Sequence, residues 1–132
     1  MTKDYLVVLD ACVLVSAGLR DTLLRLAESP RLYVPKWSED IIEEMARTLR
    51  ERDRLRSGLV ELGYCPAPSV ANFLFFDSRE DATELASRLL PHGVIVKPWR
   101  EAGYAQHVRV SVGLPQANDQ FLEVLEKVAA MS

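Results

Sequence analysis

The sequence predicts an α/β fold, with about five strands in a mixed sheet and four or five helices covering it. Short apolar runs of strand length alternate along the 132 residues with longer stretches in which apolar residues recur every three or four positions. The front half reads as strand, helix, strand and helix, the order of a parallel βαβ unit with a right-handed crossover. The back half contains strict apolar–polar alternation, which is typical of a half-buried antiparallel strand. The chain is long enough to form a single compact domain, residues 1–132, with its own core.

The first strand is predicted at Leu6–Leu9, because an unbroken apolar run is typical of a strand buried on both faces. It ends in Asp10, a carboxylate at the strand edge where α/β sheets usually place ligand sites. A helix follows, with apolar residues on one face at Leu19, Leu23 and Leu26. The next strand is Leu32–Pro35, and Ser38 is a good N-cap for the helix after it.

The stretch Ser38–Gly63 leaves two interpretations open. Its apolar residues keep helical spacing in two groups: Ile41, Ile42, Met45 and Leu49, then Leu55, Leu59 and Leu62. The charged run RERDR separates the groups, and the apolar stripe skips a step there. Either one long helix shifts phase at this point, or one helix ends and Asp53 caps a second.

The remaining strands are predicted at Asn72–Phe76, Val94–Val96 and Val108–Val112. After the first of them, Ser78 and Asp81 have the spacing of a capping box that opens a helix, and Gly93 is suited to end it. The last helix starts near Pro115 and has an apolar face made of Phe121, Leu122, Leu125 and Val128.

Composition excludes several classes of protein. The net charge of −3 disfavours a nucleic-acid partner, and no apolar run approaches the ~18 residues of a membrane span. Two cysteines, Cys12 and Cys65, supply neither a disulfide framework nor metal-ligand spacing. The first ten residues lack the features of a secretory signal, so a cytoplasmic location is expected.

Residues ~5–50, VLDACVLVSAGLRDTLLRLAE followed by LYVPKWSEDIIEEMARTL, resemble the N-terminal part of a PIN-domain nuclease. The resemblance implies that Asp10 is the first metal-binding carboxylate and Glu44 the second, with Glu43 as the alternative if the register differs by one. Carboxylate ligands of this kind suit Mg²⁺ or Mn²⁺, which activate water for phosphodiester cleavage. Two carboxylates alone would hold such an ion weakly.

Residues ~52–130 resemble the C-terminal small domain of pyridoxal-phosphate aminotransferases, most closely the histidinol-phosphate aminotransferases. The matching segments are ANFLFF, HGVIVKPW and GYAQHVRVSVGLPQANDQFLEVL. The resemblance implies that Arg109 aligns with the arginine that binds the substrate's carboxylate, a bidentate task suited to guanidinium, and that it is vestigial here because the rest of the site is absent. Leu114 departs from the small polar residue usual there, which weakens the helix cap. Lys97 and Lys127 lack the context of a Schiff-base lysine, so neither pyridoxal phosphate nor aminotransferase activity is expected.

Two partial resemblances that meet inside one helix predict an engineered or recombined chimera, PIN-like over 1–50 and aminotransferase-like over 51–132, with no enzymatic activity. One alternative is a PIN-like metal-dependent ribonuclease, for which Asp77, Glu80 or Asp81 would have to supply the further acids. Another is a small interaction module or homodimer, because recombined fragments leave apolar surface uncovered. No other partner is predicted.

Overall fold

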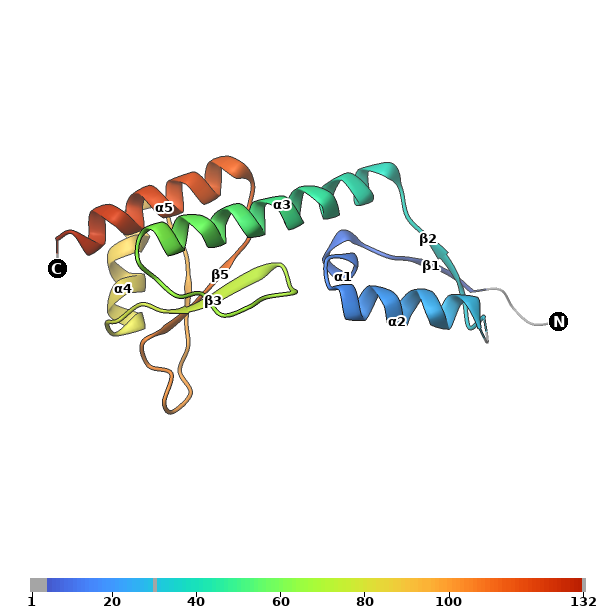
Figure 1. Cartoon of the computed structure of the whole chain (residues 1–132), viewed down its shortest axis with the longest axis horizontal. Helices are drawn as coiled ribbons and strands as arrows, with labels where there is room; N and C mark the ends of the chain where they lie inside the picture. Colours follow the sequence, from blue (N-terminus) through green and yellow to red (C-terminus); the bar gives the residue numbers. More distant parts are fainter. Residues whose placement is uncertain (1–4, 30, 132) are drawn as a thin grey trace. The chain divides into compact units, whose positions relative to one another are not determined.

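The strands among the described residues form two sheets. The computed structural model describes residues 5–29 and 31–131. It contains a parallel pair, β1 (Leu6–Val8) and β2 (Val34–Lys36), and an antiparallel sheet in the order β3 (Phe73–Asp77), β5 (His107–Ser111), β4 (Lys97–Pro98) (Figure 1). The α/β class, the parallel front and the antiparallel back half are confirmed. The one mixed sheet of about five strands is corrected to two sheets.

Contacts divide the chain into two compact units: residues 1–49 with 70–72, and residues 50–69 with 73–132. That residues 1–132 act as one compact domain stays a prediction. In the described part of the chain, no helix combines the length and apolar character that a membrane crossing requires.

The first unit is built on β1, which pairs in parallel with β2 so that Leu6 lies opposite Val34. Helices α1 (Ala11–Leu14) and α2 (Ala17–Glu28) connect the two strands. The buried apolar residues lie after β1, at Leu9, Ala11, Leu14 and Val15. The strand itself is exposed, with Leu6 69% and Val8 71% accessible, so its predicted burial on both faces is wrong. A two-stranded sheet covers too little of its own surface to bury a strand.

Helix α3 (Glu39–Glu61) is continuous through the RERDR segment, which decides between the two interpretations of this stretch. Asp53 lies within the helix and does not begin a second one. The N-cap prediction for Ser38 is confirmed, because its hydroxyl oxygen accepts a hydrogen bond from the Ile41 amide at 3.3 Å.

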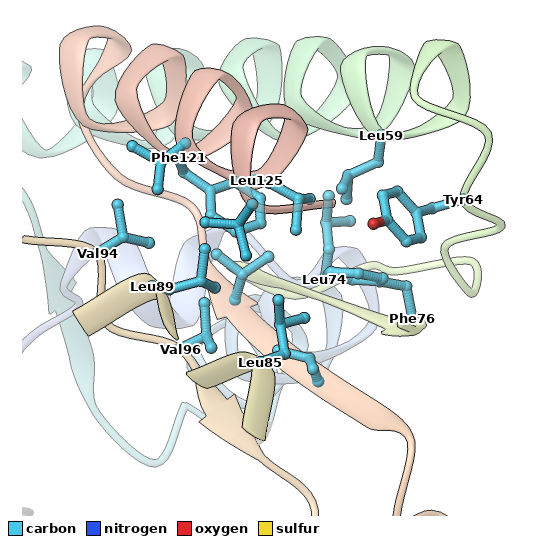
Figure 2. Packing of buried hydrophobic residues seen from close by; sticks show 14 of the residues in the cluster. Leu59, Tyr64, Leu74, Phe76, Leu85, Leu89, Val94, Val96, Phe121 and Leu125 are labelled. Atoms are coloured by element: carbon cyan, nitrogen blue, oxygen red, sulfur yellow. The ribbon is translucent and has the colours of Figure 1, made fainter. Parts of the chain in front are cut away.

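The second unit packs its helices on one face of the antiparallel sheet. Alternate residues of β3 and β5, namely Leu74, Phe76, Val108 and Val110, point into a core of leucines, valines and aromatic rings (Figure 2). The helical side of that core comes from the second half of α3, from α4 (Ala82–Leu89) and from α5 (Pro115–Ala129). Helices α3 and α5 approach closely at Gly58, where a Cβ would lie 2.5 Å from the Leu122 Cδ1 atom.

The helix ends follow the predictions in part. Asp81 is the N-cap of α4 and accepts hydrogen bonds from the Thr83 and Glu84 amides at 2.9 and 3.0 Å. Ser78 is not part of a capping box, because its buried hydroxyl donates to the carbonyl of Gln106 instead. Gly93 ends the short 3₁₀ turn η1 (Leu90–His92) with φ of 76°, as expected of a C-terminal stop.

All the strand bounds differ somewhat from the sequence prediction: β1 ends one residue early, β2 lies at Val34–Lys36, and β3 is displaced by one residue to Phe73–Asp77. Val94–Val96 is not a strand, and the edge strand β4 begins directly after it, at Lys97. The alternating strand runs over His107–Ser111, so it begins and ends one residue before the predicted Val108–Val112.

Candidate functional site

The face of the antiparallel sheet opposite the core carries a group of cationic and aromatic side chains. Because side chains alternate along a strand, Phe73 and Phe75 of β3 share this face with Arg109 of β5. Arg109 is paired in register with Phe75 on one side and with Lys97 of β4 on the other. Arg109 therefore lies in the middle strand, flanked by a ring and by a second cation. We call this surface the open sheet face.

Arg109 is half-buried, and its guanidinium lies over the Phe73 ring with 4.6 Å between the guanidinium carbon and the ring centroid. Phe73 is its diagonal neighbour, since the register partner of Phe73 is Ser111. A stacked guanidinium keeps its N–H donors at its edge, where a carboxylate or phosphate binds in bidentate fashion. No salt bridge joins Arg109 to a carboxylate within residues 5–29 and 31–131.

The ring directly opposite Arg109, that of Phe75, is held by other aromatic groups. Its centroid lies 5.0 Å from that of His107 in a stacked arrangement and 5.5 Å from that of Trp99 in an edge-to-face arrangement. Tyr104 also contacts it and lies edge-to-face on His107. Edge-to-face and offset contacts of this kind are favourable. Phe75 is therefore a fixed centre of an aromatic cluster, and Arg109 turns to Phe73.

Lys97 and Arg109 are like charges placed directly opposite one another on adjacent strands, an arrangement that costs stability by itself. Each lies over a different ring, the Lys97 ammonium being 5.5 Å from the Trp99 ring centroid. An anion bound between two such cations would relieve their repulsion. The open sheet face therefore suits a ligand with a negatively charged group.

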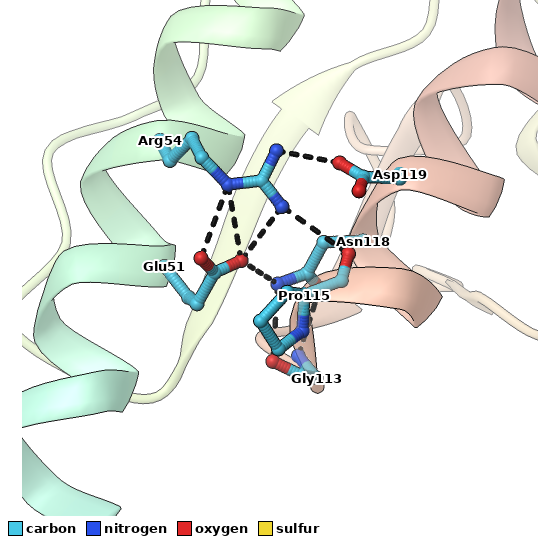
Figure 3. A network of polar contacts seen from close by, with 6 residues as sticks. All are labelled: Glu51, Arg54, Gly113, Pro115, Asn118 and Asp119. Carbon is cyan, nitrogen blue, oxygen red and sulfur yellow. Dashed lines mark hydrogen bonds and ion pairs between the residues drawn. The ribbon is translucent and has the colours of Figure 1, made fainter.

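A polar network holds the turn that follows β5 (Figure 3). The buried Asn118 amide group accepts a hydrogen bond from the Gly113 amide at 2.9 Å and donates to the Gly113 carbonyl at 3.0 Å. It also donates to the Glu51 carboxylate at 2.9 Å. Leu114 offers no side-chain cap to α5, as predicted, and Asn118 compensates by fixing the backbone just before the helix. The network thereby fixes the C-terminal end of the strand that carries Arg109.

Glu51 is 9% exposed and is paired with Arg54 at 2.8 Å, and Arg54 also contacts Asp119. Hydrogen bonds from Arg54 and then from Asn118 lower the pKa of the Glu51 carboxyl group. A pKa below its unfolded value means that Glu51 stabilises the fold above pH ~4.3, the ordinary glutamate value. This contribution is lost as the pH falls through the lowered pKa.

We expect the free energy of unfolding to fall between pH 6 and pH 3, and this fall to be smaller in Glu51→Gln. Urea unfolding at half-unit pH steps would measure it. Glu123→Gln is the control on α5. Lys127 also lowers the pKa of the Glu123 carboxyl group, but the Glu123–Lys127 ion pair is exposed. A pH dependence in Glu51→Gln equal to that of the unchanged chain would contradict the assignment.

The carboxylates predicted for a metal site, Asp10 and Glu44, both belong to the first unit. Asp10 is an exposed residue at the N-cap of α1, and its carboxylate accepts a hydrogen bond from the Cys12 thiol, which raises the pKa of Cys12. Glu44 and the alternative Glu43 are exposed on α3. Among the described residues no group of three or more His, Cys, Asp or Glu side chains could hold a metal ion. Metal binding by Asp10 and Glu44 stays a prediction without structural support.

The acids proposed to complete such a site have local roles instead. The Asp77 carboxylate accepts a hydrogen bond from the Arg79 amide at 2.8 Å. Glu80 pairs with Arg88, and Asp81 caps α4. Asp77 shares the open sheet face, where its register partner is His107.

The sequence identified Arg109 but not its surroundings. The sequence places Phe73 and Phe75 in a strand and gives Lys97 no functional context. The alternation in NFLFF and HVRV does show that both strands have a second face. The register that brings Phe73 and Lys97 to Arg109 depends on residues 12 to 36 positions apart, and no local pattern specifies it.

Comparisons with known proteins identify the relatives of this chain. The family model described as "Aminotransferase class I and II" matches residues 3–125. Histidinol-phosphate aminotransferase 3 of Rhizobium meliloti is 48% identical over 83 residues, covering 63% of this chain and 22% of the relative. The histidinol-phosphate aminotransferase of Corynebacterium diphtheriae is 35% identical over 121 residues, covering 92% of this chain and 32% of the relative. The chain thus spans about a fifth to a third of the length of these relatives.

Solved structures share the fold. The crystal structure of histidinol-phosphate aminotransferase from Sinorhizobium meliloti in complex with pyridoxal-5'-phosphate matches with a TM-score of 0.64 and 22% identity, over 71% of this chain and 27% of that one. The enzyme of the same name from Clostridium acetobutylicum gives a TM-score of 0.64 at 22% identity, over 70% and 29%.

These relatives overturn the prediction that pyridoxal phosphate plays no part, since a relative of the same fold binds it. The described residues do not fit a complete site for this cofactor. A Schiff base needs a lysine held near the cofactor's other binding groups, whereas Lys36, Lys97 and Lys127 are all exposed. Lys97 lies over Trp99, and Lys127 pairs with Glu123 at 2.6 Å.

The relatives also correct the interpretation of the whole chain. The match over residues 3–125 includes the segment assigned to a PIN-domain nuclease, so the nuclease part and the chimera are both wrong. The prediction of an engineered scaffold without enzymatic activity is wrong as well, because the relatives are named as enzymes. The match extends across both units, and the C-terminal resemblance stated from ANFLFF onwards is confirmed: this chain belongs to the aminotransferase class I and II family.

Proposed function

We propose that this chain forms the substrate-anion site of a pyridoxal-phosphate-dependent aminotransferase, with Arg109 as the group that binds the anion. The observation that supports this role is the position of Arg109 at the centre of the open sheet face, stacked on Phe73 and joined to no carboxylate among the described residues. The cofactor chemistry requires groups that the described residues do not present. The proposal therefore concerns recognition of the substrate.

The relatives' names suggest the substrate. In histidinol the carboxyl group of histidine is replaced by an alcohol, so histidinol phosphate carries a phosphate ester where an amino acid carries a carboxylate. Arg109 suits either group, because a guanidinium binds both in bidentate fashion. Lys97, in register with Arg109, adds a second positive charge and so favours the phosphate. We infer that histidinol phosphate, or an amino acid of similar shape, is the ligand of this face.

Titrating the chain with L-histidinol phosphate, followed by isothermal calorimetry or by amide shifts, tests the proposal. We expect Arg109→Ala to weaken binding at least tenfold, since a hydrogen bond to a charged group contributes about 1.5–3 kcal/mol. Arg56→Ala, which removes an exposed arginine of α3, is the matched control and should bind as the unchanged chain does. Equal binding by Arg109→Ala and the unchanged chain, with both folded, would refute the assignment.

A further inference from the structure

Phe73 is the residue on the open sheet face whose role neither the core nor the aromatic cluster explains. It is half-buried, lies at the start of β3, and points away from the core that holds Leu74 and Phe76. Its backbone is fixed, because its carbonyl accepts a hydrogen bond from the Ser69 hydroxyl at 2.6 Å. Two residues further on, the Phe75 carbonyl accepts the Ala67 amide at 2.8 Å. The first residues of β3 are therefore held in place by the segment that precedes them.

The Phe73 ring contacts Arg109 as a cation–π pair and takes no part in the cluster around Phe75. Arginine has many rotamers, so an arginine with no fixed partner must lose that freedom when it binds a ligand. A ring on one face of the guanidinium removes much of that freedom beforehand. It also leaves the N–H donors at the edge of the group available, because stacking uses only the face.

We propose that Phe73 is a positioning residue that preorganises Arg109 for anion binding. This inference rests on the proposed function of Arg109. Phe73 itself touches no ligand in this scheme. It acts by limiting the Arg109 guanidinium to one orientation, over the Phe73 ring at the middle of the open sheet face.

The first test is spectroscopic and needs no ligand. An aromatic ring shields protons that lie over its face, so the Arg109 side-chain Nε–H and Cδ proton resonances should be shifted upfield in the unchanged chain. We expect this shift to disappear in Phe73→Leu and to persist in Phe73→Tyr, which keeps the ring. Trp99→Leu is the matched control, because it removes the ring that lies next to Lys97 and leaves Phe73 in place. Arg109 resonances without an upfield shift in the unchanged chain would overturn the proposal.

The second test measures affinity for L-histidinol phosphate and, separately, for inorganic phosphate. Phe73→Leu removes a cation–π contact that is partly exposed to solvent. We expect this variant to bind about three- to tenfold more weakly. Phe73→Tyr should restore both the binding and the upfield shift. A merely structural role for a bulky side chain would not require the upfield shift to return. Phe73→Ile, which suits a strand, replaces Phe73→Leu if the leucine variant does not fold.

The outcomes separate the two proposals. If the unchanged chain and Phe73→Leu bind equally while Arg109→Ala binds weakly, the positioning role is wrong and the anion site stands. If the unchanged chain binds neither probe, the proposed function fails, and the positioning role fails with it. Weaker binding by Phe73→Leu, with restoration by Phe73→Tyr, supports both.

Discussion

Replacing Leu89 by alanine is expected to lower the free energy of unfolding by about 2.5–5 kcal/mol, the range for buried leucines whose cavity the surroundings cannot fill. Leu89 ends α4 and is fully buried among residues of all three helices and both long strands of the second unit. Figure 2 shows it between Leu85, Val96 and Leu125. Such a site is closed on every side, so relaxation into the cavity is limited.

Leu90 is the matched control for this measurement. It is the next residue along the chain and is 58% exposed, so Leu90→Ala should change the free energy of unfolding by no more than about 0.5 kcal/mol. Urea unfolding monitored by circular dichroism would compare the two variants, and equal slopes with denaturant would show that the unfolded states are comparable. Similar losses in both variants would contradict the packing of α4 described above.

The burial of Leu89 can be predicted from the sequence, because the spacing of apolar residues indicates which side of a helix faces the core. The apolar face of α4 places Leu85 and Leu89 four residues apart, and that spacing alone indicates burial. The alternation of Val108 and Val110 likewise identified the buried side of β5, and Arg109 followed as a residue of the other side. Patterns with a period can be read from the sequence because a helix or strand imposes the period wherever it lies.

Predictions failed where the answer depended on a distant segment. The run Leu6–Leu9 is apolar enough for a central strand, yet β1 has only β2 beside it, and the number of neighbouring strands is not encoded in the run itself. Ser78 and Asp81 are both good caps. The Ser78 hydroxyl instead donates to the Gln106 carbonyl at 2.7 Å, a contact across 28 residues, which leaves Asp81 as the cap.

The nuclease interpretation failed for a related reason. Many α/β proteins have a strand that ends in a carboxylate, as at Asp10, followed by a helix, a strand and an acidic helix. This order therefore carries little information about function. The aminotransferase resemblance rested on specific residues, among them the arginine in VRVSVG, and it was confirmed. The charge of Asp10 and Glu44 is explained by their exposure, since exposed carboxylates need no ligand.

Replacing Asn118 by alanine is expected to cost about 1–3 kcal/mol of stability, although it removes only one small side chain. Asn118 is 2% exposed, and its amide group forms hydrogen bonds with the Gly113 amide, the Gly113 carbonyl and the Glu51 carboxylate. The Glu51 carboxylate is buried and would lose a partner, and leaving a buried polar group unsatisfied costs about 1–3 kcal/mol, whereas the exposed Gly113 groups can bind water instead. Arg54 would still hold Glu51, which is why the expected cost is below the sum of three lost bonds.

A double-mutant cycle tests this account of the network. Because Asn118 and Glu51 share a hydrogen bond, the double variant Glu51→Gln with Asn118→Ala should be less destabilised than the sum of the single variants, by at least about 0.5 kcal/mol. The exposed neighbour Asp119 supplies a comparison on the same helix through Asp119→Ala, since its carboxylate pairs with Arg54. Strict additivity between Glu51 and Asn118 would mean that the two act independently. The stability of the turn after Arg109 would then come from Gly113 and Asn118 alone, and changes at Glu51 should leave anion binding by Arg109 unaffected.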